Sequence, residues 1–451
     1  MTASERRAMT TDPVAVAASE VIGGPRGRYA ARELPWMFTA AVLSALAAIP
    51  AGFGIALRIP CLRTHWSGDG QFWNACYSDL PNAYREGNLG AGLAAFLQSA
   101  EGAPTTGQPP LTGLMLTAVA SLVPSADREG TRIAWYFALW AVLLTLLLLA
   151  VIWLVASSSR RPWTAAHVAL APVVALVGFV SADLLGVALA SAGMWAWGRR
   201  HLAAAGVLLG LAISARSYPV LILVAIGLLA LRSGRLRQFA RTASYALATF
   251  LGVLGVLWLL HPEAAVSAYR GWVAAGPGYG SPWLLPQLAG HPLPTWAVTA
   301  LAVLGWVVAI VVGAALALAS ARRPTIAEVS LVMVGIVLVT GKSFTVQSSL
   351  WLVPLVAWSL VQWRDHLIWA AAEAMNFVAV WLKIAAGKVP DRGLPDPWYA
   401  FFSMLRVIAV LWLVAMVWLH ARERWGRSEP EPDDLAGPMT EAEDRVIVRF
   451  T

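Results

Sequence analysis

The chain has 451 residues, of which 58% are hydrophobic and 13% charged. Soluble domains have about 45–50% apolar and about 25% charged residues, so the composition excludes an ordinary soluble enzyme. The net charge of +8 comes mostly from arginines beside apolar segments, a pattern typical of cytoplasmic anchoring, and no nucleic-acid partner is expected. Apolar blocks of about 15 to 25 residues predict an all-α polytopic membrane bundle, because about 20 helical residues cross a bilayer.

Three regions follow one another along the chain. Residues 1–36 are arginine-rich, lack the apolar core of a signal peptide, and are expected to form a disordered cytoplasmic lead. Residues 37–421 form the transmembrane domain. Residues 422–451 include an acidic, proline-containing stretch without apolar periodicity and are expected to be a disordered cytoplasmic tail. We predict twelve spans, at residues 37–57, 132–156, 164–181, 183–198, 202–214, 218–231, 242–260, 297–319, 326–341, 349–363, 366–387 and 399–421.

The distribution of arginines orients these spans. With both termini in the cytoplasm of a plasma-membrane protein, most of the 33 basic residues fall on the inner side, as the positive-inside rule requires. The apolar block at 111–123 is too short to span and is bounded by prolines, so we expect a helix that lies at the interface or re-enters it. The segments between 183 and 231 are also short, which leaves a fused or broken helix pair open there. The exterior then presents two large loops, residues 58–131 and 261–296.

The first exterior loop holds the strongest candidates for chemistry. Its two cysteines, Cys61 and Cys76, are the only ones in the chain, and an oxidising exterior favours a disulfide between them. Asp79 follows shortly after, and a carboxylate held at a membrane surface can serve as general base toward a sugar hydroxyl. The alternative for Asp79 is a solvated carboxylate or a helix N-cap. Asp69, between two glycines, is a second choice whose simplest explanation is a turn.

Two cations in polar turns lie on the same predicted side as Asp79. Arg216 stands between two spans, and Lys342 stands in a polar interruption between two others. Each could contact lipid headgroups or hold a lipid phosphate, and the sequence leaves both open. Arg270 and His261, from the second large loop, are weaker candidates. The sequence contains no phosphate-binding glycine loop, metal-ligand cluster or nucleophile elbow.

Together, these motifs resemble those of a known family. The chain resembles the GT-C superfamily of polyprenyl-phosphate-sugar glycosyltransferases, and within it the actinobacterial membrane mannosyltransferases of glycosyltransferase family 87. The resemblance covers residues 37–421, with arginine at 216 where the family has lysine. It rests on four elements in the same order: Tyr77-Ser78-Asp79, then Pro109-Pro110-Leu111-Thr112-Gly113, then Arg216-Ser217-Tyr218-Pro219, then Lys342 to Gln347 before Leu350-Trp351-Leu352-Val353-Pro354.

The resemblance implies inverting, metal-independent sugar transfer on the outer face of the membrane, without a cofactor. The donor would be a polyprenyl-phosphate sugar, mannose before arabinose or glucose, and the acceptor a glycolipid or lipoglycan of the cell envelope, with membrane lipids as further partners. Asp79 would be the base, because the attacking hydroxyl must lose a proton. Lys342, Arg216, Arg270 and His261 would meet the leaving phosphate. The residues expected to bind substrate are Tyr77, Asp69, Gln108, Tyr218, Gln347 and Trp283.

Other features leave alternatives open. Most of the 23 tryptophans suit the interfacial belt, whereas Trp66, Trp73, Trp272 and Trp283 fall in exterior loops where an indole could stack on a sugar. The glycine-rich stretch 276–282 suits a mobile cover or a static turn. Glu373 and Arg406 fall inside spans, so we expect a structural polar contact within the last two spans, with a direct pair left open. The rival functions are a lipid or solute transporter, weakened by the lack of an internal repeat, and a noncatalytic envelope-assembly scaffold.

Overall fold

The computed structural model describes residues 12–14, 17, 35–98, 106–389, 393–423 and 433–447. Helices make up 76% of the described residues, which contain no strand, so the predicted all-α class is confirmed. The expected disordered lead, residues 1–36, lies almost entirely outside the described residues.

Six helical stretches of the described chain are long and apolar enough to cross a membrane. The shortest has 24 residues, which at 1.5 Å per residue exceeds the ~30 Å of the hydrocarbon core. The first is continuous through α3 (Trp36–Leu46), α4 (Ala48–Ala56) and α5 (Ile59–Thr64). The others are α10 (Glu129–Ser158), α16 (Leu236–Leu260), α19 (Thr295–Ala319), α22 (Trp363–Ala386) and α23 (Asp396–Glu423).

The six other predicted spans coincide with shorter apolar helices. Four are single helices of 14 to 16 residues, namely α13 (Asp183–Gly198), α14 (Leu202–Ala215), α15 (Pro219–Arg232) and α20 (Ile326–Thr340). Predicted span 164–181 is broken into η2 (Pro162–Ala165), α11 (Ala166–Ala169) and α12 (Pro172–Val177), and span 349–363 into η4 (Val346–Trp351) and α21 (Val353–Trp358). Proline early in α12 and α21 suits helix starts, since it lacks the N–H that a helix interior needs.

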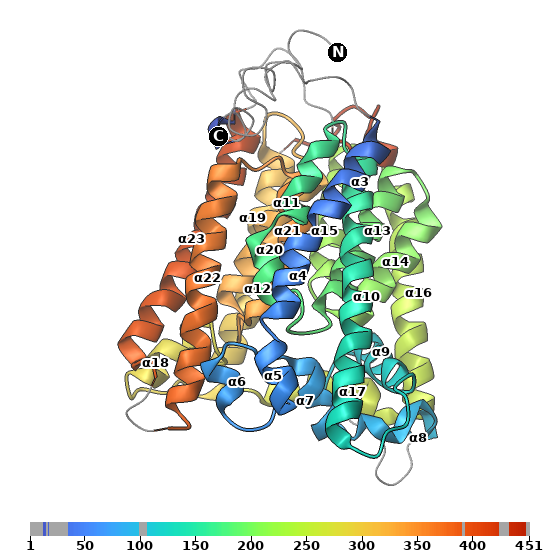
Figure 1. The fold of residues 1–451 in the computed structure, drawn as a ribbon. Coiled ribbons are helices and arrows are strands. Elements are labelled where there is room, and N and C mark those ends of the chain that lie inside the picture. Colours follow the sequence, from blue (N-terminus) through green and yellow to red (C-terminus); the bar gives the residue numbers. More distant parts are fainter. Residues whose placement is uncertain are drawn as a thin grey trace.

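Figure 1 shows that α3 begins and α23 ends at one end of the bundle, which we call the tail end. The opposite end, the loop end, gathers the short helices of both large loops. These are α5, α6 (Gly70–Trp73), α7 (Asp79–Glu86), α8 (Gly92–Gln98), α9 (Pro110–Ala120), α17 (Pro262–Ala274) and α18 (Leu285–Leu288). With 11 residues, α9 is too short to span, and seven of its residues are buried against its neighbours.

The C-terminal segment 433–447 differs from the disordered tail that its composition predicts. Its Asp444 carboxylate accepts hydrogen bonds from Arg232 Nε at 2.9 Å and Arg323 Nε at 2.8 Å. Its Leu435 and Met439 side chains are buried. The composition is misleading here because the acidic charges meet arginines at the ends of helices, so that the segment orders by neutralising them.

Candidate functional site

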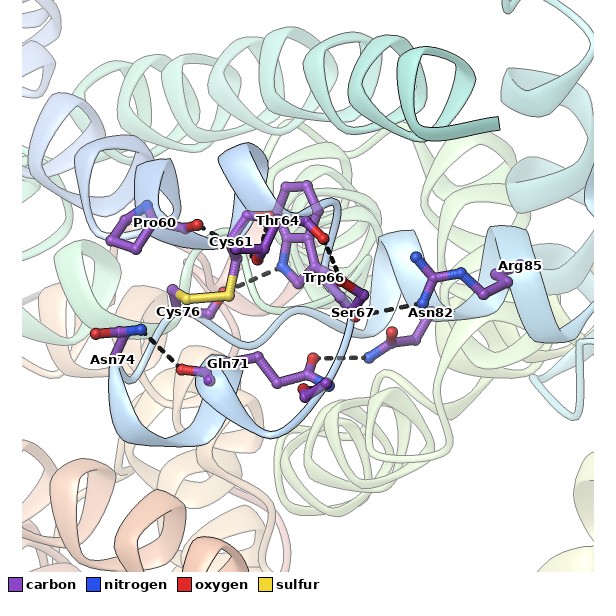
Figure 2. Close-up of a disulfide and its surroundings, with 12 residues drawn as sticks. Pro60, Cys61, Thr64, Trp66, Ser67, Gln71, Asn74, Cys76, Asn82 and Arg85 are labelled. Atoms are coloured by element: carbon purple, nitrogen blue, oxygen red, sulfur yellow. Dashed lines mark hydrogen bonds between the residues drawn. A yellow bond between two sulfur atoms is a disulfide. The ribbon is translucent and has the colours of Figure 1, made fainter. Parts of the chain in front are cut away.

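A disulfide fixes the loop that precedes the candidate base. Cys61 and Cys76 are bonded, the pairing that the sequence predicts. Figure 2 shows the Trp66 indole beside the bridge, where its Nε1 donates to the Cys76 carbonyl at 3.1 Å. Trp66 is 1% exposed and packs on Phe137 at a ring distance of 4.9 Å. Trp66 is therefore a core residue, which differs from the sugar-stacking role that its place in a loop suggested.

Ser78 anchors the start of α7 and thereby sets the position of Asp79. The Ser78 hydroxyl caps the helix by accepting from Leu80 N and lies 3.0 Å from the carbonyl oxygens of Phe179 and Val180. The Asp79 N–H donates to Val180 O at 2.7 Å. The N-cap of α7 is thus Ser78 rather than Asp79, which corrects the capping alternative. The Asp79 side chain therefore does not cap α7 and can contact groups from other helices.

The surroundings of the Asp79 carboxyl group shift its pKa toward neutral pH. The pKa of Asp79 is raised to about 6, chiefly by burial. A hydrogen bond from Tyr77 lowers this pKa, the nearby Asp183 raises it, and the nearby Arg216 lowers it. Gln347 Nε2 donates to Asp79 Oδ2 at 3.1 Å, across 268 residues of sequence. A carboxylate with a pKa near the working pH is suited to general base catalysis.

A buried ion pair lies next to Asp79. Arg216 donates two parallel hydrogen bonds to the Asp183 carboxylate, from Nε at 2.9 Å and from Nη2 at 2.8 Å. Their side chains are 12% and 3% exposed, respectively. Such bidentate pairs are among the strongest hydrogen-bonded contacts in proteins and fix the guanidinium in one plane. The cation that the sequence assigns to a phosphate therefore has a carboxylate partner within the protein.

The remaining motif residues surround this pair. Arg216 Nη1 donates to Gln108 Oε1 at 3.3 Å and to Thr112 Oγ1 at 3.2 Å, which brings the start of α9 to the site. Tyr218 stacks on Trp351 with ring centroids 4.7 Å apart and planes 14° from parallel. Residues from all four elements thus meet, because the fourth element contacts the third through Trp351 and the first through Gln347, and Arg216 contacts the second through Thr112.

Other predicted site residues lie outside this cluster. Lys342 Nζ donates to three carbonyl oxygens at the end of α17, those of Trp272, Val273 and Ala275, at 2.8 to 3.1 Å. A lysine at a helix C-terminus satisfies carbonyls that have no partner in the helix. Lys342 is therefore a cap of α17 in this structure.

Among the described residues, no hydrogen bond joins the second large loop, residues 261–296, directly to Asp79, Asp183, Arg216 or Gln347. Arg270 pairs with Glu263 on the surface, with both side chains more than half exposed. His261 is buried at the junction of α16 and α17, with its ring edge against Phe96. Trp283 Nε1 donates to the Thr340 carbonyl. In the first loop, Asp69 is exposed at the start of α6.

Asp183, the first residue of a predicted span, is a site residue that the sequence does not predict. It is the only acidic residue between Glu129 and Glu263, and it is embedded in an apolar stretch. That isolation is a usable signal, because an ionisable group in a membrane segment is costly unless it has a partner. Trp351 was noted only as part of a motif, yet its Nε1 donates to Asp183 Oδ1 at 2.7 Å.

Within the described residues, no group of three or more histidine, cysteine, aspartate and glutamate side chains could hold a metal ion. Comparisons of the chain with known protein families and with curated proteins find no match.

Proposed function

We propose that the chain is a membrane glycosyltransferase of the GT-C type, which transfers a sugar, mannose first, from a polyprenyl-phosphate donor to an envelope glycolipid or lipoglycan. One observation carries the proposal. The four elements that resemble the family converge on a partly buried carboxylate, Asp79, whose pKa lies near 6. A purely structural role would not require Gln347, Gln108, Tyr218 and Asp79 to meet at one end of the bundle.

In the proposed reaction Asp79 takes the proton of the attacking acceptor hydroxyl. The acceptor oxygen forms the new bond to the sugar C1 on the face opposite the phosphate, and the bond from C1 to the phosphate oxygen breaks. The configuration at C1 is inverted, and the polyprenyl phosphate leaves with the bonding electron pair. Negative charge grows on the phosphate as it leaves, so a preorganised cation stabilises the transition state.

Arg216 is our first choice for that cation. Its Nη1 donates to the Ala215 carbonyl at 3.0 Å and makes its two longer contacts, at 3.2 to 3.3 Å, to Thr112 and Gln108, against 2.8 to 2.9 Å for the bonds to Asp183. A phosphate oxygen would replace the longer contacts while Asp183 holds the rest of the guanidinium in plane. Lys342 is a second choice, because its three N–H groups already have carbonyl acceptors.

The topology that we propose places the loop end at the outer face of the plasma membrane, with twelve spans and both termini in the cytoplasm. Supporting this orientation, arginines from four separate helix connections meet the C-terminal segment at the tail end. That concentration of basic residues is what the positive-inside rule expects of a cytoplasmic face.

The test is sugar transfer in proteoliposomes that contain the purified chain and a radiolabelled polyprenyl-phosphate mannose. Wild-type protein should transfer label to an envelope glycolipid extract, and Asp79→Asn should not. Asp127→Asn, which removes an exposed charge from the same loop, should retain activity. Equal transfer by wild type and Asp79→Asn would remove the base role. Movement of labelled lipid between leaflets without a new glycosidic bond would favour the transporter.

A further inference from the structure

The turn between α20 and η4, residues 341–345, leads directly to the glutamine that contacts the candidate base. It has no regular hydrogen-bond ladder of its own, so its conformation depends on partners elsewhere in the chain. Gln347, in the first helical turn after it, reaches Asp79 at 3.1 Å. Whatever fixes this turn therefore fixes the distance between Gln347 and Asp79.

Arg406, on α23, holds the end of the turn that leads into η4. Its Nη1 donates to the carbonyl of Phe344, and its Nη2 donates to the carbonyl of Thr345 at 2.9 Å and to Ser349 Oγ at 2.8 Å. Its Nε donates to Glu373 Oε2, on α22, at 2.7 Å. One guanidinium thus joins α22, α23 and both sides of Gln347, and it is fully buried.

The carboxylate that orients Arg406 is itself held in place by a second contact. Trp369 Nε1 donates to the second oxygen of Glu373 at 3.0 Å, so that carboxylate has a partner on each oxygen. The pair is therefore satisfied within the protein, as a charge at membrane depth must be. The expected polar contact in the last two spans is present as a direct ion pair, and its other side faces the turn.

The second exterior loop closes over the same turn. Gly278 N donates to Lys342 O at 2.7 Å, and Phe344 N donates to Tyr279 O at 3.1 Å. Gly280 has φ +79°, and a Cβ at that position would collide with the Phe344 carbonyl oxygen. The loop holds the start of the turn through these backbone contacts and through Ser281 Oγ, which donates to Gly341 O at 2.7 Å, while Arg406 holds its end next to Gln347.

We propose that Arg406 is a positioning residue that holds Gln347 against Asp79, an inference that rests on the proposed function of Asp79 as the base. Arg406 touches no reacting atom and acts only through the backbone of the turn. Lysine cannot replace it, because a single ammonium point cannot reproduce the planar fork that reaches two carbonyls, a hydroxyl and a carboxylate together.

The first test is the pH dependence of kcat/KM for sugar transfer. Gln347 donates to the charged form of Asp79, so losing this bond should raise the acid-side midpoint. We expect Gln347→Leu and Arg406→Lys each to raise it by about 0.5 pH units, a roughly threefold change in the protonation equilibrium. The double variant should move it no further, since both changes remove the same contact.

Arg232→Lys is the matched control. Arg232 is also fully buried and paired with a carboxylate, but it lies at the tail end. Its substitution should lower yield without moving the midpoint. If Arg406→Lys lowers only the amount of folded protein, or if its shift adds to that of Gln347→Leu, Arg406 is not the residue that positions Gln347.

A second test does not depend on activity. Hydrogen–deuterium exchange of the peptide that covers residues 341–351 should rise roughly tenfold in Arg406→Lys, and less in Ser349→Ala, which removes one of the four contacts. Exchange in α13 and α14 should stay as in wild type. Unchanged exchange in 341–351 would overturn the positioning role. Failure of wild-type protein to transfer sugar, with raised exchange in Arg406→Lys, would overturn the proposed function and leave the contact itself established.

Discussion

Substituting Asp79 with asparagine should stabilise the protein at pH 8 while it abolishes transfer. The carboxylate has its pKa raised from 3.8 to about 6, chiefly by burial. An acid with a raised pKa in the folded state contributes full stability below pH 3.8, and this contribution is lost as the pH rises through about 6. At pH 8 the folded protein therefore carries the cost of a desolvated charge.

The size of that cost follows from the shift. A rise from 3.8 to about 6 corresponds to about 3 kcal/mol when the group is fully ionised in both states. Because the Asp79 side chain is only partly buried, solvent screening lowers the expected gain to about 1 to 2 kcal/mol. In a chain of this size, such a gain raises Tm by roughly 1 to 4 °C.

The assay is thermal unfolding in detergent, followed by intrinsic tryptophan fluorescence, at pH 8, 6 and 4. Asp79→Asn should exceed wild type in Tm at pH 8, and the difference should shrink toward pH 4. Asp69→Asn, which removes an exposed charge from the same loop, should have the Tm of wild type at all three pH values. A Tm of Asp79→Asn at or below that of wild type at pH 8 would refute the reasoning, because it would show that the carboxylate is stabilised as an anion in the folded protein.

Three further predictions concern charges and covalent links. Arg216→Ala should raise the donor KM. It should also destabilise the chain by about 3 to 5 kcal/mol, measured through Tm, because the buried Asp183 carboxylate loses its partner. Arg216→Lys should partly restore both the donor KM and the Tm. Asp444→Asn should speed hydrogen exchange of the C-terminal segment several-fold, whereas Glu443→Gln, an exposed neighbour, should not. Replacing Cys61 and Cys76 with serine should lower stability by about 3 kcal/mol, because the bond closes a loop of 15 residues; an unchanged Tm would contradict this.

The helices were predictable from the sequence because apolar length is a local property. Each of the twelve predicted spans coincides with a helical segment, and the 111–123 block forms α9, a helix too short to span. The breaks inside the segments at 164–181 and 349–363 were not predicted. There the chain is surrounded by other helices, so hydrophobicity persists while the helix stops and restarts at proline.

Partners that are distant in sequence limited the prediction of the site. Lys342 and Arg216 occupy similar polar turns, and the sequence treats them alike as free cations. Their difference lies in what reaches them, carbonyls at the end of α17 for Lys342 and the carboxylate of Asp183 for Arg216. Neither partner is within 30 residues, and no local pattern records the contact. The C-terminal segment was misjudged for the same reason, since its composition cannot show the arginines that it meets.

The two acids at the site are distinguished by their hydrogen bonds, and this assigns their roles. The oxygens of Asp183 accept four hydrogen bonds, two from Arg216, one from Ser181 and one from Trp351. With its acceptor positions filled and a guanidinium in plane, Asp183 has no place for a substrate proton. Asp79 has an amide donor in Gln347 and no cation in direct contact, and its pKa lies near 6. In the proposed reaction Asp183 would therefore hold the Arg216 guanidinium, and Asp79 would accept the proton of the acceptor hydroxyl.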